Sequence, residues 1–134
     1  SAVTTVPGKD YCVALLLLQK RHEDAKGNIT AQRVGTVVVK YGKSTNGWVE
    51  DATYEIHYGN ITGKPFYDAS MMGLRSTDYV RNSKGKSVLV KETGWADADA
   101  KPTHIVLQFS SSHGGAYVGT VGNTFWVDNV GLVY

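Results

Sequence analysis

The stretch YCVALLLLQKRHEDAKGNITAQRVGTVVVKY, residues 11–41, decides the fold class of this chain. Its first eight residues are apolar throughout, a turn sequence AKGN occupies residues 25–28, and the run QRVGTVVVKY follows. Alternation in that run places Val37, Val39 and Tyr41 on one side, and a period of two is typical of β-strands. Because residues 11–18 are apolar at every position, we expect a central strand that is covered on both faces.

The same period recurs further along the chain. In THIVLQFS, residues 103–110, it separates an apolar set from an outward set that includes His104, and TFWVDNVGLVY, residues 124–134, is expected to be the closing strand. Turn sequences separate these runs and almost no helical pattern is present, so we predict an all-β fold, an antiparallel β-sandwich of jelly-roll type. The predicted shared core consists of Trp48, Tyr54, Ile56, Ile105, Leu107 and Phe109.

Length, charge and cysteine usage limit the classes of protein. A chain of 134 residues is long enough for one domain, and we interpret residues 1–8 as a tag or linker remnant. The net charge of +2, without a run of five like charges, argues against a nucleic-acid partner. The single cysteine, Cys12, excludes an intrachain disulfide and is interpreted as a buried structural thiol. The apolar run is too short to cross a bilayer, so we expect no membrane insertion by this domain.

Three constellations of residues suggest chemistry, each beside a plainer interpretation. Two acids across a cleft would suit glycoside hydrolysis, but Asp97 and Asp99 in WADADA read first as solvated loop acids. The same two acids with Asp128 would suit a hard cation such as Ca²⁺, although no EF-hand pattern is present. The serine run at residues 110–112 with His104 or His113 evokes acyl transfer, but without a GxSxG motif it is more simply a polar loop.

Four aromatic residues lie in loop-like surroundings rich in Gly, Asp and Ser. Sugars present apolar C–H faces ringed by hydroxyl groups, so an exposed aromatic ring beside amides and carboxylates suits them. The alternative is that each ring folds back as a lid over a sheet edge. Tyr117 is the favoured candidate because its glycine-rich loop exposes backbone amides. The candidate ligand-binding residues are Tyr67, Tyr79, Trp95 and Tyr117.

The closing stretch PTHIVLQFSSSHGGAYVGTVGNTFWVDNVGLVY, residues 102–134, resembles the end of the carbohydrate metabolism domain family of gut-bacterial cell-surface lipoproteins. AKGNITAQRVGTVVV and GWVEDATYEIHY are similar to two earlier strands of that family, whereas residues 63–100 are not covered. Two departures matter: Asn123 stands where the family usually has Ser, a mild change, and residues 63–100 are longer than in the family, so no site there can be carried over. The matching positions are Ser110, Ser111, Ser112, Gly115, Gly119, Gly122, Val127, Asp128, Val130, Leu132 and Tyr134.

The resemblance implies a jelly-roll similar to carbohydrate-binding modules and supplies no catalytic residues. It also implies an extracellular or periplasmic location in a Gram-negative bacterium, within a larger chain that carries other domains. We therefore expect a non-catalytic, glycan-associated module without a cofactor. The alternative is a structural or assembly domain that spaces partners in a surface complex, and the least favoured reading is a glycoside hydrolase.

Overall fold

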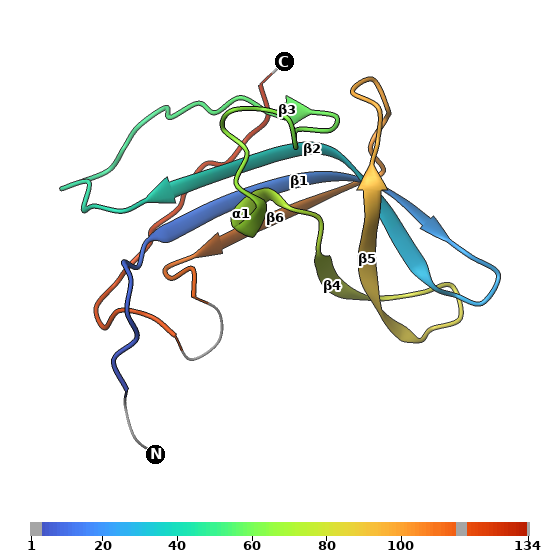
Figure 1. Cartoon of the computed structure of the whole chain (residues 1–134), viewed down its shortest axis with the longest axis horizontal. Helices are drawn as coiled ribbons and strands as arrows, with labels where there is room; N and C mark the ends of the chain where they lie inside the picture. Colours follow the sequence, from blue (N-terminus) through green and yellow to red (C-terminus); the bar gives the residue numbers. More distant parts are fainter. Residues whose placement is uncertain (1–3, 115–117, 134) are drawn as a thin grey trace. The chain divides into compact units, whose positions relative to one another are not determined.

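The computed structural model describes residues 4–114 and 118–133 (Figure 1). The only helix in these ranges is α1, which has four residues, so the all-β prediction is confirmed. Asp68 caps the start of this short helix by accepting a hydrogen bond from the Ser70 backbone N–H. The elements are β1 (Cys12–Glu23), β2 (Ile29–Tyr41), β3 (His57–Tyr58), α1 (Ala69–Met72), β4 (Ser76–Arg81), β5 (Ser87–Trp95) and β6 (His104–Ser110).

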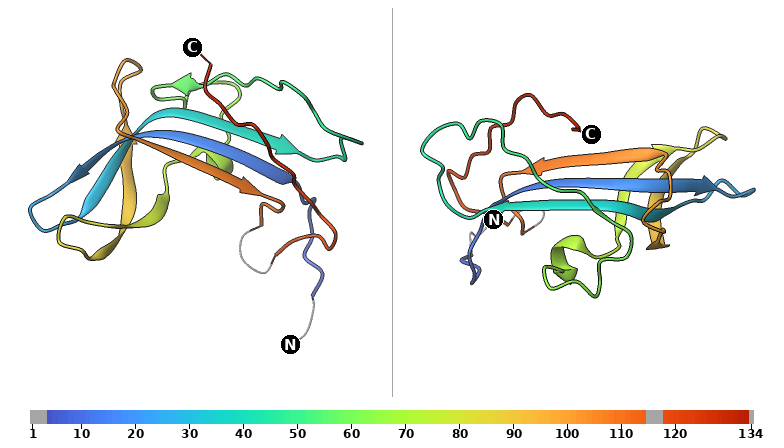
Figure 2. Two further views of the ribbon diagram at one scale, coloured as in Figure 1. Left: turned by 180° about the vertical axis from the view of Figure 1, so that it is seen from behind. Right: turned by 90° about the horizontal axis from the view of Figure 1, so that it is seen from above.

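The strands form one curled sheet in the order β4-β5-β2-β1-β6, and β3 pairs separately with β2. β6, β1 and β2 run side by side in the right-hand view of Figure 2. β1 therefore has a neighbour on each side, as predicted for a central strand. β4 and β5 are antiparallel, but β2 and β5 are parallel. The parallel pair of β2 and β5, whose connection contains β3, α1 and β4, makes the sheet mixed. The predicted antiparallel jelly roll is not confirmed.

The described residues group into two compact units. Unit 1 comprises residues 4–14, 39–52, 108–114 and 118–133. Unit 2 comprises residues 15–38 and 53–107, and it contains the buried core described next. β1, β2 and β6 contribute residues to both units.

The core of unit 2 consists of two apolar clusters. Successive side chains of a strand point to opposite faces, so Leu17 and Leu18 of β1 enter different clusters. Leu17 packs with Leu15 and Val106, and Leu18 packs with Val34 and Ala96. β1 therefore contributes buried side chains on both faces, as its continuous apolar run predicts.

Two hairpin turns of unit 2 are fastened together by a buried asparagine. The β1–β2 turn contains Gly27 at φ 85° and the β4–β5 turn contains Gly85 at φ 76°, a conformation that glycine adopts without strain. Asn82 Nδ2 donates a hydrogen bond to the Gly27 carbonyl oxygen at 2.9 Å. A Cβ atom on Gly27 would lie 2.4 Å from Asn82 Nδ2, so this approach needs glycine for steric reasons too. The contact holds β4 beside the end of the β1–β2 hairpin.

The predicted face of β6 is wrong. Val106 is the buried residue, whereas Ile105, Leu107 and Phe109 are exposed by 53%, 47% and 38%. A period of two identifies which residues share a face, but not which face is covered. Val106 is covered because it packs on Leu17, whereas Ile105 and Leu107 on the other face are about half exposed.

Two predicted strands are also wrong in whole or in part. Within residues 48–58 only His57 and Tyr58 are extended into the sheet, and the described residues 124–133 contain no strand. Asp51 and Asn129 both adopt φ 52°, which breaks an extended run. Trp48 and Tyr54 are consequently exposed rather than in the core, while Ile56 packs against the Leu18 cluster and not against its predicted partners.

Candidate functional site

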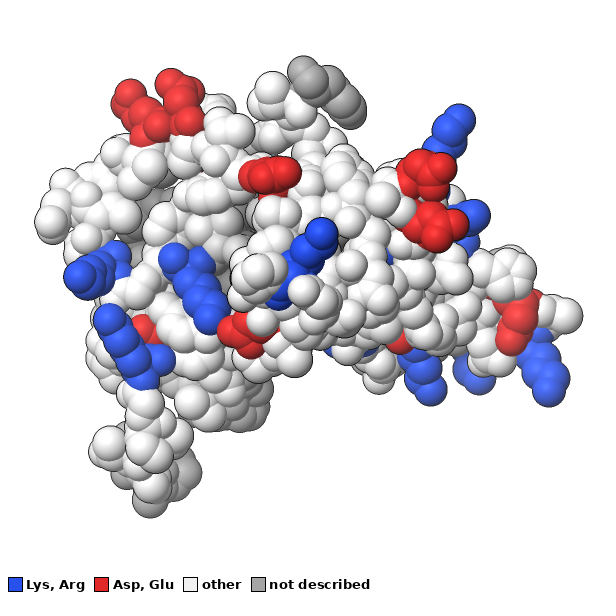
Figure 3. All heavy atoms as spheres, turned by 45° about the horizontal axis from the view of Figure 1, so that its top comes forward, with Lys and Arg blue, Asp and Glu red and all other residues white. Residues whose placement is uncertain are grey.

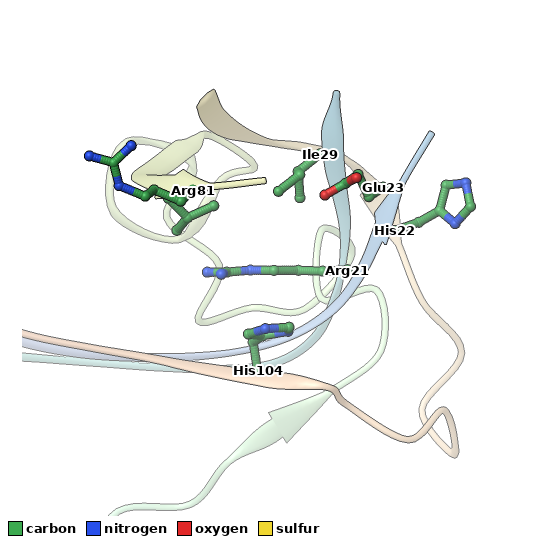
Figure 4. Close-up of a pocket in the computed structure, with 7 residues that line it drawn as sticks. Arg21, His22, Glu23, Ile29, Arg81 and His104 are labelled. Carbon is green, nitrogen blue, oxygen red and sulfur yellow. The ribbon is translucent and has the colours of Figure 1, made fainter. Parts of the chain in front are cut away.

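A solvent-open cavity of about 470 Å³ lies between the β1–β2 hairpin, β4 and the start of β6, all within unit 2 (Figure 4). Its volume falls within the range of about 300–1,000 Å³ that is typical of small-molecule sites. Two apolar side chains, two arginines, two histidines and one carboxylate form its wall. The lining residues are Arg21, His22, Glu23, Ile29, Val80, Arg81 and His104.

Arg21 extends across the cavity, and a neighbour on its own strand holds it there (Figure 4). The Nε–H of Arg21 donates to Gln19 Oε1 at 2.9 Å. Gln19, which is fully buried, donates from Nε2 to the Glu92 carboxylate at 3.1 Å. Nη1 and Nη2 of Arg21 donate to no other group in the part of the chain that the structure describes. The guanidinium is therefore oriented at one edge and has free donors at the other.

The buried anchor of this chain of hydrogen bonds is the ion pair between Arg33 on β2 and Glu92 on β5. Arg33 Nε donates to Glu92 Oε2 at 2.6 Å and Nη2 donates to Oε1 at 2.5 Å, which is a bidentate arrangement. Both side chains are almost completely buried. Each oxygen of Glu92 accepts a second bond, Oε2 from Gln19 and Oε1 from the Arg75 backbone N–H.

Arg33 has all five of its N–H donors occupied. Nη1 donates to Thr36 Oγ1 and to the Met72 carbonyl oxygen, and Nη2 also donates to the Gly73 carbonyl oxygen. The end of α1 is thereby fastened to β2. Because a buried charge is tolerated only when it is paired and hydrogen-bonded, this network is a rigid foundation for Gln19 and, through it, for Arg21.

Burial, neighbouring charges and hydrogen bonds shift the pKa values of three side chains in the cavity wall. Burial lowers the pKa of Arg21 below its usual value, while Asp78 and Glu92 raise it in part. Burial and the charge of Arg21 lower the pKa of His104. The Glu23 carboxylate accepts hydrogen bonds from the backbone N–H and the hydroxyl of Ser83, which lower its pKa. The one carboxylate of the lining is therefore already engaged by the β4–β5 turn.

His104 is fixed by its neighbour in the sequence. Thr103 Oγ1 lies 2.7 Å from His104 Nδ1 and accepts a hydrogen bond from the Arg21 backbone N–H at 2.9 Å. Nε2 makes no hydrogen bond within residues 4–114 and 118–133. The imidazole thus offers Nε2 to the cavity beneath Arg21 (Figure 4).

The basic lining of the cavity is a local feature. On the face drawn in Figure 3, basic and acidic side chains occur singly or in small groups, without a large field of one sign. The formal net charge of the chain is only +2. Attraction of a ligand would therefore depend on the cavity walls rather than on a long-range field.

The aromatic residues predicted from the sequence do not form one flat exposed platform. Tyr67 and Trp95 are half-buried and meet edge to face, with ring centroids 6.4 Å apart and an interplanar angle of 72°. Trp95 also lies under the Arg33 guanidinium, 5.3 Å from the ring centroid to Cζ. Tyr79 on β4 is 72% exposed and stands apart from this pair, and Tyr117 lies outside the described residues.

The acids predicted to bind a cation are placed in different units. Asp97 and Asp99 are exposed in the turn after β5, whereas Asp128 belongs to unit 1 and accepts a hydrogen bond from the Asn129 backbone N–H. Across the described ranges, no group of three His, Cys, Asp or Glu side chains is suitably placed for a metal ion. The structure gives the calcium prediction no ligand cluster.

The serine run and His113 meet at Asp10 in unit 1. Asp10 accepts hydrogen bonds from Ser112 Oγ at 2.7 Å, from the Thr120 backbone N–H at 2.9 Å and from Asn123 Nδ2 at 3.3 Å. His113 Nδ1 lies 3.0 Å from Asp10 Oδ1. Ser112 donates to the carboxylate rather than to an imidazole, so the arrangement is a loop fastening and not an activated nucleophile.

Acidification is expected to loosen this fastening. The hydrogen bond from Ser112, aided by those from His113 and Thr120, holds the pKa of Asp10 well below its usual range despite partial burial. A depressed pKa stabilises the fold above the ordinary aspartate pKa of about 3.9, and that stabilisation fades as the pH falls further. Asp10→Asn should therefore lower the melting temperature at pH 7, with a gap to wild type that narrows below about pH 4.

Melting temperatures of the two proteins between pH 3 and pH 7 test this expectation. Asp97→Asn, which removes an exposed carboxylate of unit 2, is the matched control. A gap between wild type and Asp10→Asn that is as large at pH 3 as at pH 7 would contradict the assigned role of Asp10.

Sequence reasoning missed Arg21, Arg33 and Glu92. It ended the first strand at Leu18, although alternation continues through QKRHE and places Gln19 and Arg21 on the face of Leu17. Polar residues that continue the buried face of an apolar strand are a signal of a polar network. Extending the strand by five residues would have identified that face.

Comparison of the chain with protein-family models, with curated proteins and with solved structures found no match. The resemblance of residues 102–134 to the carbohydrate metabolism domain family stays a prediction.

Among the residues that the structure describes, no helix has both the length and the apolar character needed to cross a membrane.

Proposed function

We propose that this chain is a non-catalytic, glycan-associated binding module, and that its ligand site is the cavity beside Arg21. The observation that carries the proposal is a cavity of about 470 Å³ whose walls combine apolar side chains with oriented hydrogen-bond donors. Saccharides present apolar C–H faces and many hydroxyl groups, and such mixed walls suit both. The resemblance of the chain's end to a glycan-associated family supports the same choice of ligand. It also supports an extracellular or periplasmic location in a Gram-negative bacterium, as part of a larger surface protein.

The residues of the cavity favour binding over hydrolysis. Glycoside hydrolysis ordinarily uses two carboxyl groups on opposite sides of the scissile bond. Glu23 is the one carboxylate that lines the cavity, and Ser83 already engages it. Asp97 and Asp99, the acids considered for hydrolysis from the sequence, are not among the lining residues.

A glycan array tests the proposal when wild type is compared with two variants of β4. Val80→Trp fills the cavity, whereas Tyr79→Ala removes an exposed ring from the adjacent position. We expect wild type to bind at least one glycan with a dissociation constant of roughly micromolar to millimolar. Binding should be lost in Val80→Trp and kept in Tyr79→Ala.

The other outcomes identify which part of the proposal fails. Loss of binding in Tyr79→Ala with retention in Val80→Trp would move the site to the exposed aromatic ring. If wild type binds no glycan at all, the function as a binding module is overturned and the structural or assembly alternative takes its place. Turnover of a bound glycan by wild type would contradict the non-catalytic assignment.

A further inference from the structure

Two guanidinium groups, those of Arg21 and Arg81, supply free hydrogen-bond donors to the cavity. Arg21 is fixed through Nε and presents two unoccupied Nη groups. Arg81, from β4, uses Nη1 on the Gly85 carbonyl oxygen at 2.7 Å and has no other side-chain hydrogen bond in the described chain. With Glu23 engaged by Ser83, the walls hold two permanent cations and one occupied carboxylate. Glu23 keeps its charge, and Asp78 and Glu92 act on Arg21 from outside the lining, so the positive charge is partly offset. The two arginines still outnumber the one carboxylate of the walls, an excess that an anionic ligand would balance and a neutral one would not.

An oxyanion complements these donors better than a hydroxyl group does. A planar guanidinium matches a carboxylate or sulfate with parallel N–H donors, and such charge-assisted bonds are about twice as strong as neutral ones. Because Gln19 already orients Arg21, little side-chain freedom remains to be lost when an anion binds. His104 Nε2 can donate a further bond when Nδ1 accepts from Thr103 or when the ring is protonated.

We propose that the cavity selects acidic saccharides, whose carboxylate or sulfate group binds the free Nη groups of Arg21 with help from Arg81 and His104. This inference rests on the proposed function, because it names the class of glycan that the same cavity takes. The apolar part of the wall, formed by Ile29 and Val80, would contact the C–H face of the sugar ring.

Calorimetry with two matched pairs of ligands tests the selection on the full chain. The pairs are trigalacturonate with its methyl ester, and sialyllactose with its methyl ester; within each pair the second ligand lacks the charge. Sodium sulfate is the probe for an anion without a sugar. We expect at least one acidic member to bind about tenfold or more tightly than its neutral partner, and less tightly as salt is added.

Variants assign that preference to the cavity. Arg21→Gln should weaken binding of the acidic ligand by about 10- to 100-fold, because it removes a charge-assisted contact. Lys64→Gln, which removes an exposed cation of unit 2 that does not line the cavity, should leave the affinity unchanged. If Arg21→Gln fails to fold, Arg81→Gln provides the test from the other strand, with a smaller loss in the same direction.

The possible failures are distinguishable. Equal affinity for the charged and neutral members of both pairs would overturn the selection of acidic ligands and leave the binding module intact. Binding of sulfate that depends on Arg21, with no binding of any saccharide, would support the anion site and overturn the glycan function. Binding of an acidic saccharide that survives both arginine substitutions would overturn the cavity as its site.

Discussion

Replacing Glu92 by glutamine is expected to lower the free energy of unfolding by about 3–5 kcal/mol, the largest effect that the structure predicts for a single substitution. Glutamine has nearly the same shape, but it removes the charge that compensates the buried Arg33 guanidinium. It also replaces an acceptor oxygen with an N–H₂ group that faces other donors. Denaturant unfolding followed by circular dichroism measures the change.

Two comparisons make the test specific to the buried pair. Glu55→Gln makes the same chemical change at an exposed position and should alter stability by less than about 0.5 kcal/mol. In a double-mutant cycle, Arg33→Met with Glu92→Met should cost less than the sum of the two single changes, because the double variant buries no unpaired charge. Additive costs, or a loss below about 1 kcal/mol for Glu92→Gln, would show that the pair is not buried as described.

Truncation of Leu17 to alanine is expected to cost about 2–5 kcal/mol, whereas the same truncation at Leu107 should cost less than about 1 kcal/mol. Leu17 is completely buried and packs with Leu15 and Val106, while Leu107 is 47% exposed on the face of β6 opposite Val106. The two substitutions remove the same atoms, so the difference reports burial alone. Chemical denaturation of both variants under one set of conditions measures it.

A larger loss of stability in Leu107→Ala than in Leu17→Ala would contradict this account. It would mean that the Leu107 face of β6 is the buried one, as alternation suggested. Val106→Ala supplies an independent check on the same strand. Its side chain is 7% exposed and it lies between Ile105 and Leu107, which alternation assigned to the core. It should destabilise the protein more than Leu107→Ala does, although it removes fewer atoms.

The fold class could be predicted from the sequence, because β-strands leave a period of two that does not depend on what covers them. The apolar run at residues 11–18 predicted the internal position of β1, and the turn at residues 25–28, which contains Gly27, was identified. The pairing of strands could not be predicted, since β2 and β5 meet in parallel across a connection that contains β3, α1 and β4. Nor could local pattern reveal that Asp51 and Asn129 adopt left-handed backbone conformations in otherwise strand-like runs.

The candidate site was harder to predict, because it is assembled from residues far apart in the chain. His104 was assigned to the outward face, but by alternation it shares a face with the buried Val106, and its position beside Arg21 depends on the order of β1 and β6 in the sheet. The pairing of Arg33 with Glu92 spans 59 positions and leaves no local pattern. Trp95, which was predicted to contact a ligand, lies under the Arg33 guanidinium, a contact that no local pattern indicates.

A chain of hydrogen bonds connects the buried ion pair to the cavity wall. Arg33 fixes Glu92, Glu92 fixes Gln19, and Gln19 fixes Arg21 at the cavity wall. Positioning of a ligand-binding side chain by supporting hydrogen bonds is a general requirement of selective sites.

The most direct test of the central claim is a nuclear magnetic resonance titration of the ¹⁵N-labelled full chain with the acidic trisaccharide trigalacturonate and with sialyllactose. We predict that the largest chemical-shift changes occur at the Arg21 side-chain Nε–H and at the backbone amides of Val80 and His104. The amides of Asp97 and Asp99 should stay unchanged. Shifts that instead gather around Tyr79 or the turn after β5, with the Arg21 Nε–H signal unmoved, would contradict the assignment of the cavity as the ligand site.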